Sequence, residues 1–148
     1  MLINITSYLE ERLASDGSNV AVFDGETHLT FIELAERAAG LADWLISHRT
    51  RENGPVLILG SKSWEAIAAM NGILLAGNFY CPADPASPPQ RLAQIVENLD
   101  PIAIVGEDSV LANHADLIPD LPAFYFSSFR EKRSSSFLQH RANLNATR

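Results

Sequence analysis

The stretch Leu75–Leu92, with the sequence LAGNFYCPADPASPPQRL, decides the fold of this chain. It places one glycine, four prolines and Asp84 between an apolar helix pattern and an amphipathic one. Each proline fixes φ and removes a backbone hydrogen-bond donor, so the segment favours a short strand and a rigid loop over a continuous helix. We therefore expect a strand at Phe79–Cys81 that follows one helix and leads through a proline-rich loop into the next.

Strands and helices alternate on both sides of this stretch. Residues 56–59 (VLIL) form a continuous apolar run, as expected for a parallel strand that is covered on both faces. Gly60–Ser63 turns into a helix that runs to about Ala76, and Pro88–Leu99 has the spacing of an amphipathic helix. A further strand is expected at 101–105. Two successive β-α-β units with right-handed connections predict an open α/β fold with a parallel sheet.

The N-terminal part predicts a helix, a hairpin and a second helix. Apolar residues recur at helical spacing over Ile3–Ala14, and Asp24-Gly25 is a turn signal that joins short strands at 20–23 and 28–30. Thr30 and Glu33 have the Thr-x-x-Glu spacing of a capping box, which predicts that a long helix begins there.

Beyond Gly106 the pattern weakens. A helix is expected over 108–117 and a strand over 123–126. Residues 127–148 are polar and basic and show no sustained period. The sequence therefore predicts a folded part over 1–126 and a flexible basic tail over 127–148.

Composition and charge favour a globular protein of the cytoplasm. The net charge is −7, and because residues 130–148 carry about +4, the first 129 residues carry about −11, which argues against nucleic-acid binding. No apolar run approaches the roughly 20 residues that cross a bilayer, and the N-terminus lacks the pattern of a signal peptide. Cys81 is the only cysteine, so no intramolecular disulfide forms and a reducing compartment fits best.

Two motifs resemble core motifs of the adenylate-forming enzymes, which include acyl-CoA synthetases and the amino-acid-activating domains of nonribosomal peptide synthetases. The first motif is residues 29–34, LTFIEL, in which Phe31 stands where the family has tyrosine. The second lies in the opening stretch, and its matching residues are Ala76, Gly77, Tyr80, Pro82, Asp84, Pro85, Pro88, Arg91 and Leu92. The resemblance covers about Ile3–Glu107, and residues 54–77 are most similar to the branch that activates D-alanine for loading onto a carrier protein.

This resemblance implies the N-terminal subdomain of the family's large domain, with a short β-hairpin followed by a β-α-β-α-β parallel sheet. The complete enzyme would join a carboxylate to AMP with ATP and Mg²⁺, release pyrophosphate, and pass the acyl group to a thiol of a carrier protein or CoA. The family's phosphate loop, its nucleotide-binding motifs and its catalytic lysine are not found among these residues. We therefore expect a fragment that is inactive alone and has no catalytic, cofactor-binding or metal-binding residues of its own. Its expected partner is the remainder of the enzyme, or a second copy bound through an exposed sheet edge.

Two alternatives to the ligase fragment remain open from the sequence. One is a docking module derived from an adenylation domain. The other is a small nucleotide-binding protein that uses Gly60-Ser61-Lys62-Ser63, which follows a strand and opens a helix but lacks the other glycines of a phosphate loop. For this segment an ordinary strand-to-helix turn with Ser63 as cap is the preferred interpretation. The sequence does not name the activated carboxylate.

The remaining polar candidates are better explained by structure than by chemistry. Asp84 and Arg91 are expected to pair or cap across the proline-rich loop, and Thr30 and Glu33 to cap a helix. Cys81 is expected to pack in a buried strand. The histidines are scattered without ligand spacing, and the two tryptophans are expected in the core or at its rim; these residues are His28, His48, His114, His140, Trp44 and Trp64.

Overall fold

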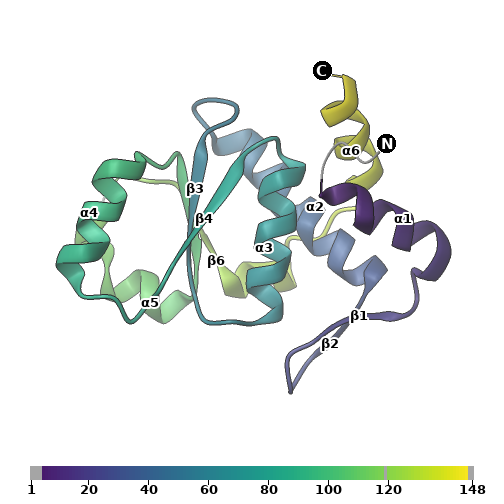
Figure 1. Ribbon diagram of the computed structural model, residues 1–148, viewed down its shortest axis with the longest axis horizontal. Helices are drawn as coiled ribbons and strands as arrows, with labels where there is room; N and C mark the ends of the chain where they lie inside the picture. The colour runs from purple at the N-terminus through teal and green to yellow at the C-terminus, as the bar shows by residue number, and fades with distance from the viewer. Residues whose placement is uncertain (1–4, 119, 147–148) are drawn as a thin grey trace.

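A four-stranded parallel sheet lies at the centre of the molecule, with helices on both faces (Figure 1). The computed structural model describes residues 5–118 and 120–146. The strands are β1 (Val20–Phe23), β2 (His28–Thr30), β3 (Pro55–Leu59), β4 (Phe79–Ala83), β5 (Ala103–Gly106) and β6 (Ala123–Tyr125). The helices are α1 (Thr6–Asp16), α2 (Phe31–His48), α3 (Trp64–Leu75), α4 (Pro89–Leu99), α5 (Asp108–Asn113) and α6 (Phe137–Ala146), with 3₁₀ helices η1 (Ala115–Leu117) and η2 (Phe126–Arg130).

The order of the strands confirms the predicted α/β class. β1 and β2 form a small antiparallel hairpin, and the main sheet has the order β4-β3-β5-β6 with all neighbours parallel. From β3 the chain passes through α3 to β4 on one side, then returns through α4 to β5 on the other side of β3. The carboxyl ends of β3 and β5 therefore flank a switch point, which is where ligands bind in open α/β sheets.

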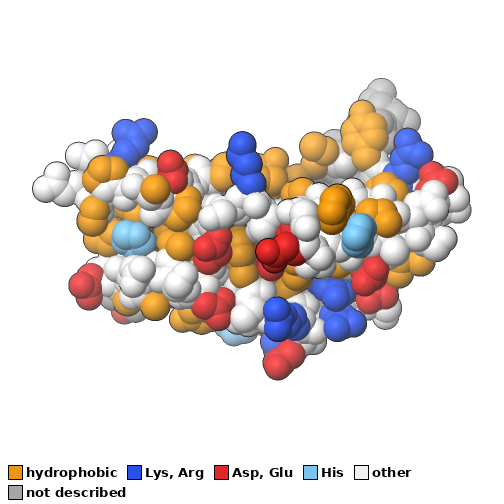
Figure 2. All heavy atoms as spheres, turned by 90° about the horizontal axis from the view of Figure 1, so that it is seen from below, with side chains coloured by type: hydrophobic (Ala, Val, Ile, Leu, Met, Phe, Trp, Pro, Cys, Tyr) orange, Lys and Arg blue, Asp and Glu red, His pale blue; other side chains and the backbone are white. Residues whose placement is uncertain are grey.

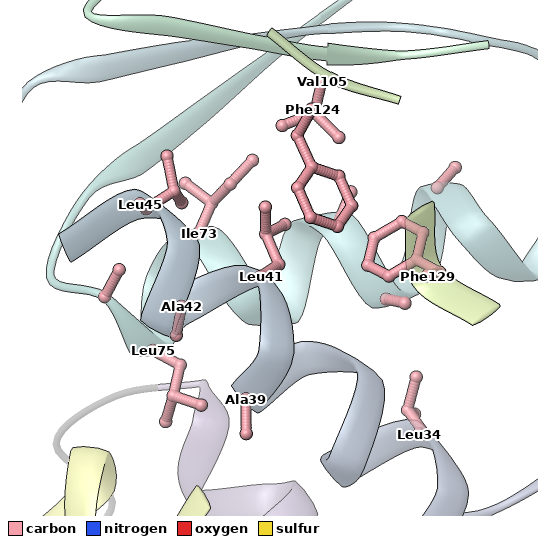
Figure 3. Packing of buried hydrophobic residues seen from close by; sticks show 14 of the residues in the cluster. Leu34, Ala39, Leu41, Ala42, Leu45, Ile73, Leu75, Val105, Phe124 and Phe129 are labelled. Atoms are coloured by element: carbon pink, nitrogen blue, oxygen red, sulfur yellow. The ribbon is translucent and has the colours of Figure 1, made fainter. Parts of the chain in front are cut away.

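Alternating side chains of the central strands fill two separate cores. Val56 and Ile58 of β3 face the layer of α2 and α3, whereas Leu57 and Leu59 face α4 and α5. Figure 3 shows the larger core, in which Leu41 of α2 approaches residues of the sheet and of α3. Since both faces of β3 are covered, its continuous apolar sequence is explained.

Helix ends follow the local signals in the sequence. Thr30 Oγ1 accepts a hydrogen bond from the Glu33 amide and Glu33 Oε1 accepts one from the Thr30 amide, both at 3.1 Å, which confirms the capping box at the start of α2. Ser63 caps α3 through the Ala66 amide. At the other end of α3, Gly77 has a φ of 82° and the chain reverses into β4. This left-handed φ is one that glycine adopts without strain, so Gly77 ends α3 and lets the chain turn into the strand.

Two predicted helices have different limits. α1 begins at Thr6 in the structure, and residues 3 and 4 of the predicted helix lie outside the described residues. α5 ends at Asn113, and the predicted helix over 108–117 is completed by the 3₁₀ helix η1.

The C-terminal segment differs from the flexible tail that the sequence predicts. Between residues 127 and 146 the chain forms most of η2 and all of α6, and Phe129 and Phe137 are buried in the larger core. Arg141 of α6 is 4% exposed and pairs with Glu10 of α1 at 3.1 Å. The prediction failed because isolated phenylalanines in a polar sequence carry no periodic signal, although each one fills a space in the core.

Asp43 connects this C-terminal segment to α2. Its carboxylate accepts a hydrogen bond from Ser136 Oγ at 3.1 Å and lies 2.5 Å from His140 Nε2. Burial alone would raise the pKa of Asp43, but hydrogen bonds from Ser134, His140 and Ser136 outweigh that effect, and the pKa lies below its ordinary value of 3.8.

The substitution Asp43→Asn is expected to destabilise the protein at neutral pH and to have less effect in acid. Because the pKa is lower in the folded state, the carboxylate stabilises the fold above pH 3.8 and this contribution disappears as the pH falls through the folded-state value. The side chain is 47% exposed, so solvent screening limits the loss to about 1 kcal/mol. Urea unfolding at neutral pH and at about pH 3 measures it. An equal loss at both pH values would contradict the proposed linkage, and Asp116→Asn, at an exposed carboxylate, is the control.

Candidate functional site

A cleft of about 620 Å³ opens at the carboxyl ends of the parallel strands. It lies between the β1–β2 turn, the N-terminal half of α2, the start of α3, and the segments that follow β5 and β6. Its lining residues are Asp24, Glu26, Thr27, His28, Leu29, Glu33, Arg37, Ser63, Trp64, Glu65, Glu107, Asp108, Phe126 and Arg130. Figure 2 views the molecule from this end and shows acidic side chains near the middle of the face, with a group of basic side chains beside them.

Several backbone amides around this cleft already donate hydrogen bonds to carboxylates of the chain itself. Glu107 Oε1 accepts a hydrogen bond from the Ser61 amide at 2.6 Å, immediately after β3. Asp24 Oδ2 accepts one from the Trp64 amide at 3.4 Å, and Asp108 accepts from both the amide and the hydroxyl of Ser127. These amides are therefore not available to hold the oxygens of a phosphate.

The charge of the cleft also disfavours phosphate. Six of its lining residues carry carboxylates and two carry guanidinium groups. Hydrogen bonds from the Thr27 and Glu26 amides hold the pKa of Asp24 below its ordinary value, so this carboxylate stays ionised. A polyphosphate placed here would meet negative charge from several directions.

Gly60 has a packing role in this part of the fold. A methyl group on Gly60 would come within 2.6 Å of the Phe126 ring, so close packing explains the glycine. Since the Ser61 amide is bonded to Glu107 and Ser63 caps α3, the geometry favours an ordinary strand-to-helix turn at Gly60–Ser63. Nucleotide binding at this segment is therefore not favoured.

Arg37 is the residue of this cleft that sequence reasoning missed. It lies on α2 and is 8% exposed, with its guanidinium carbon 5.7 Å from the centre of the Trp64 ring. Its Nε and Nη1 have no hydrogen-bond partner among the described residues. The available signal was its position, since Arg37 stands one helical turn from Leu34 and Leu41 on the apolar face of the predicted helix.

The residues of the proline-rich loop have a structural role, because they shape the backbone between β4 and α4. Asp84 Oδ1 accepts a hydrogen bond from the Ala86 amide at 2.9 Å, which shapes the turn before α4. The expected pairing of Asp84 with Arg91 is not among the ion pairs of the described residues. Cys81 is a free thiol and is only partly buried, contrary to the prediction, because β4 is an edge strand of the sheet.

The histidines lie on four separate elements or loops. His28 stacks on Phe23 in the hairpin, and His48 stacks on Trp44 at the end of α2. Within residues 5–118 and 120–146 there is no group of three acidic, histidine or cysteine side chains placed to hold a metal ion. His140, Asp43 and Ser136 do meet, but Ser136 donates to the carboxylate, an arrangement that does not activate a serine nucleophile.

Trp44 and Trp64 are placed as the sequence predicts. Trp64 is buried, and Trp44 is partly buried with its ring packed edge-on against Phe124. Both rings therefore belong to the core or its rim.

The parallel sheet with its antiparallel hairpin has the architecture of the N-terminal subdomain of an adenylation domain. The family model described as "AMP-binding enzyme" matches residues 9–139. This chain therefore belongs to the AMP-binding enzyme family.

Two relatives of known sequence are nonribosomal peptide synthetases of fungi. Nonribosomal peptide synthetase penN of Penicillium thymicola is 37% identical over 103 residues, which are 69% of this chain and 4% of that protein. Nonribosomal peptide synthetase asqK of Emericella nidulans is 36% identical over 98 residues, which are 66% of this chain and 4% of that protein. The chain thus spans a small part of the length of these relatives.

Solved structures agree with this assignment. The nonribosomal peptide synthetase FmoA3, in a form bound to α-methyl-L-serine-AMP, matches with a TM-score of 0.80 and 26% identity over 89% of this chain and 15% of that one. VinN matches with a TM-score of 0.77 over 95% of this chain and 36% of that one, and at 18% identity this likeness concerns the fold alone. No helix within the described residues is long and apolar enough to cross a membrane.

Proposed function

We propose that this chain forms the N-terminal part of an adenylation domain that activates an amino acid as its acyl adenylate. The complete enzyme would use ATP and Mg²⁺, release pyrophosphate and transfer the aminoacyl group to the thiol of a carrier protein. This chain would supply the first parallel strands, their covering helices and the hairpin. The observation that carries the proposal is the match to FmoA3 at a TM-score of 0.80 and 26% identity.

The chain alone is proposed to be inactive. Its match covers 15% of the FmoA3 chain, and the amides around its own cleft are bonded to carboxylates. Adenylation needs backbone donors and a basic group around the ATP phosphates. Those groups would come from the remainder of the enzyme, which is also the proposed partner. Activation of D-alanine stays a prediction from the sequence.

Amino-acid-dependent exchange of pyrophosphate into ATP tests this proposal. The chain alone, with Mg²⁺ and a mixture of amino acids, is expected to show no exchange above the blank. Exchange by the chain alone would contradict the proposed inactivity. The coding sequence downstream provides a second test, because a phosphate-loop motif in any frame would supply the missing groups, and fusion of that segment to the chain is expected to produce exchange.

A further inference from the structure

Arg37 is a buried cation whose donors are not satisfied by the part of the chain that the structure describes. Its side chain lines the cleft at the carboxyl ends of the strands, and 8% of the residue is exposed. Nε and Nη1 are buried without a hydrogen-bond partner. An arginine keeps its charge in a protein, so burial in this state is costly unless an anion completes the arrangement.

The nearby charges do not supply that anion. Glu33 and Glu36 favour the charge of Arg37, but no ion pair joins either to it among the described residues, and Glu33 Oε1 already accepts the Thr30 amide. Arg133 opposes it. Burial and this second cation together lower the pKa of Arg37. Arg37 therefore has no carboxylate within ion-pair distance among the described residues, although carboxylates line the same cleft.

We propose that Arg37 receives the carboxylate of one aspartate or glutamate on a segment of the remaining enzyme that packs across this cleft. The inference rests on the proposed function, because that remainder is the source of the segment. A carboxylate matches the fork of donors on a guanidinium, and the Trp64 ring beneath holds that fork in place. We further propose that basic residues flank the acidic one.

The acidic residues around the cleft determine which kind of ligand can reach Arg37. The acidic residues at the mouth of the cleft, Asp24, Glu26, Glu65, Glu107 and Asp108, would repel a free polyanion such as a nucleotide. A peptide segment with one central carboxylate and basic neighbours satisfies both the buried cation and the acidic rim. A nucleotide would supply an anion for Arg37, but the acidic residues of the cleft would repel it.

The first experiment compares two buried arginines in the isolated chain. Arg37→Met removes an unpaired charge and is expected to raise Tm by about 3–8 °C. Arg141→Met is the matched control, because Arg141 is 4% exposed but pairs with Glu10, and this substitution is expected to lower Tm. An unchanged or lower Tm for Arg37→Met would show that the chain already satisfies Arg37 and would overturn the proposal.

The second experiment identifies the occupant. In a Trp44→Phe background, Trp64 is the fluorescent reporter beside Arg37. The probes are the peptides acetyl-KKDKK-amide and acetyl-KKNKK-amide, and inorganic phosphate. We expect the aspartate peptide to bind about tenfold more tightly than the asparagine peptide, and this difference to vanish in Arg37→Met. Equal binding of the two peptides, or tighter binding of phosphate, would overturn the proposed occupant.

These readouts are separate from the test of the proposed function. Tm and peptide binding are measured on the isolated chain and do not depend on adenylation. If pyrophosphate exchange appears in the isolated chain while the Arg37 results hold, the proposed inactivity fails and the carboxylate site stands. If the Arg37 results fail while the fused enzyme is active, only this inference is lost.

Discussion

Phe129→Ala is expected to lower the free energy of unfolding by about 3–5 kcal/mol. Phe129 has no exposed surface, and its ring centre lies 4.9 Å from that of Phe124 and 5.8 Å from that of Trp64. Truncation therefore leaves a cavity between α3, β6 and η2 that the surrounding rings cannot fill. Urea unfolding followed by circular dichroism measures the loss.

Phe23→Ala is the matched control for this substitution. Phe23 lies in the β1–β2 hairpin and is 62% exposed, so the same change there is expected to cost about 1 kcal/mol or less. A loss at Phe129 as small as that at Phe23 would mean that η2 does not belong to the core.

Gly40→Ala is expected to destabilise the protein by at least about 2–3 kcal/mol, although alanine normally stabilises a helix relative to glycine by about 1 kcal/mol. A methyl group on Gly40 would lie 1.8 Å from the carbonyl oxygen of Lys132, a backbone atom that cannot rotate away. α2 and the 132–133 segment must therefore separate. We expect a lower midpoint of urea unfolding and faster trypsin cleavage after Arg130, Lys132 and Arg133.

Ser47→Ala, on the exposed C-terminal turn of the same helix, is the control and is expected to change stability by about 0.5 kcal/mol or less. If Gly40→Ala proved as stable as the unsubstituted protein and equally resistant to trypsin, the close contact of the 132–133 segment with α2 would be contradicted.

The parts of the fold that depend on neighbouring residues were predictable. The capping box of Thr30 and Glu33 needs only four residues, and the unbroken apolar run of β3 indicates its two covered faces. The turn at Gly77 follows from the one residue type that adopts its φ without strain. In each case the signal and the structure that it produces lie in the same short segment.

The parts of the fold that depend on contacts between residues far apart in the sequence could not be predicted. Asp43 meets His140 across 97 positions, and Phe129 is buried by residues of α3 and β6. Nothing near residue 129 in the sequence reports those partners, so the sequence pattern predicts a flexible tail there. The partial exposure of Cys81 depends on strand order, because an apolar strand is equally compatible with the middle and the edge of a sheet.

The lack of an ion-pair partner for Arg37 is another feature that depends on residues far away in the sequence. A helix pattern shows that the residue lies among apolar neighbours, but whether an anion reaches it depends on elements that are far away in the chain. Only the three-dimensional arrangement shows that Glu33 is engaged by its own cap and that Arg133 adds a second positive charge nearby. The candidate cleft was therefore beyond the reach of sequence patterns, whereas the family was not.

Pro82 affects which edge of the sheet can pair with a further strand. It lies inside β4 opposite Ile58 of β3, and a proline has no amide hydrogen to contribute to a ladder. β4 is thus suited to remain the outer margin, which also limits edge-to-edge aggregation on that side. β6, at the opposite margin, has no proline within Ala123–Tyr125. Any further strand that joins this sheet is therefore expected to pair with β6 rather than with β4.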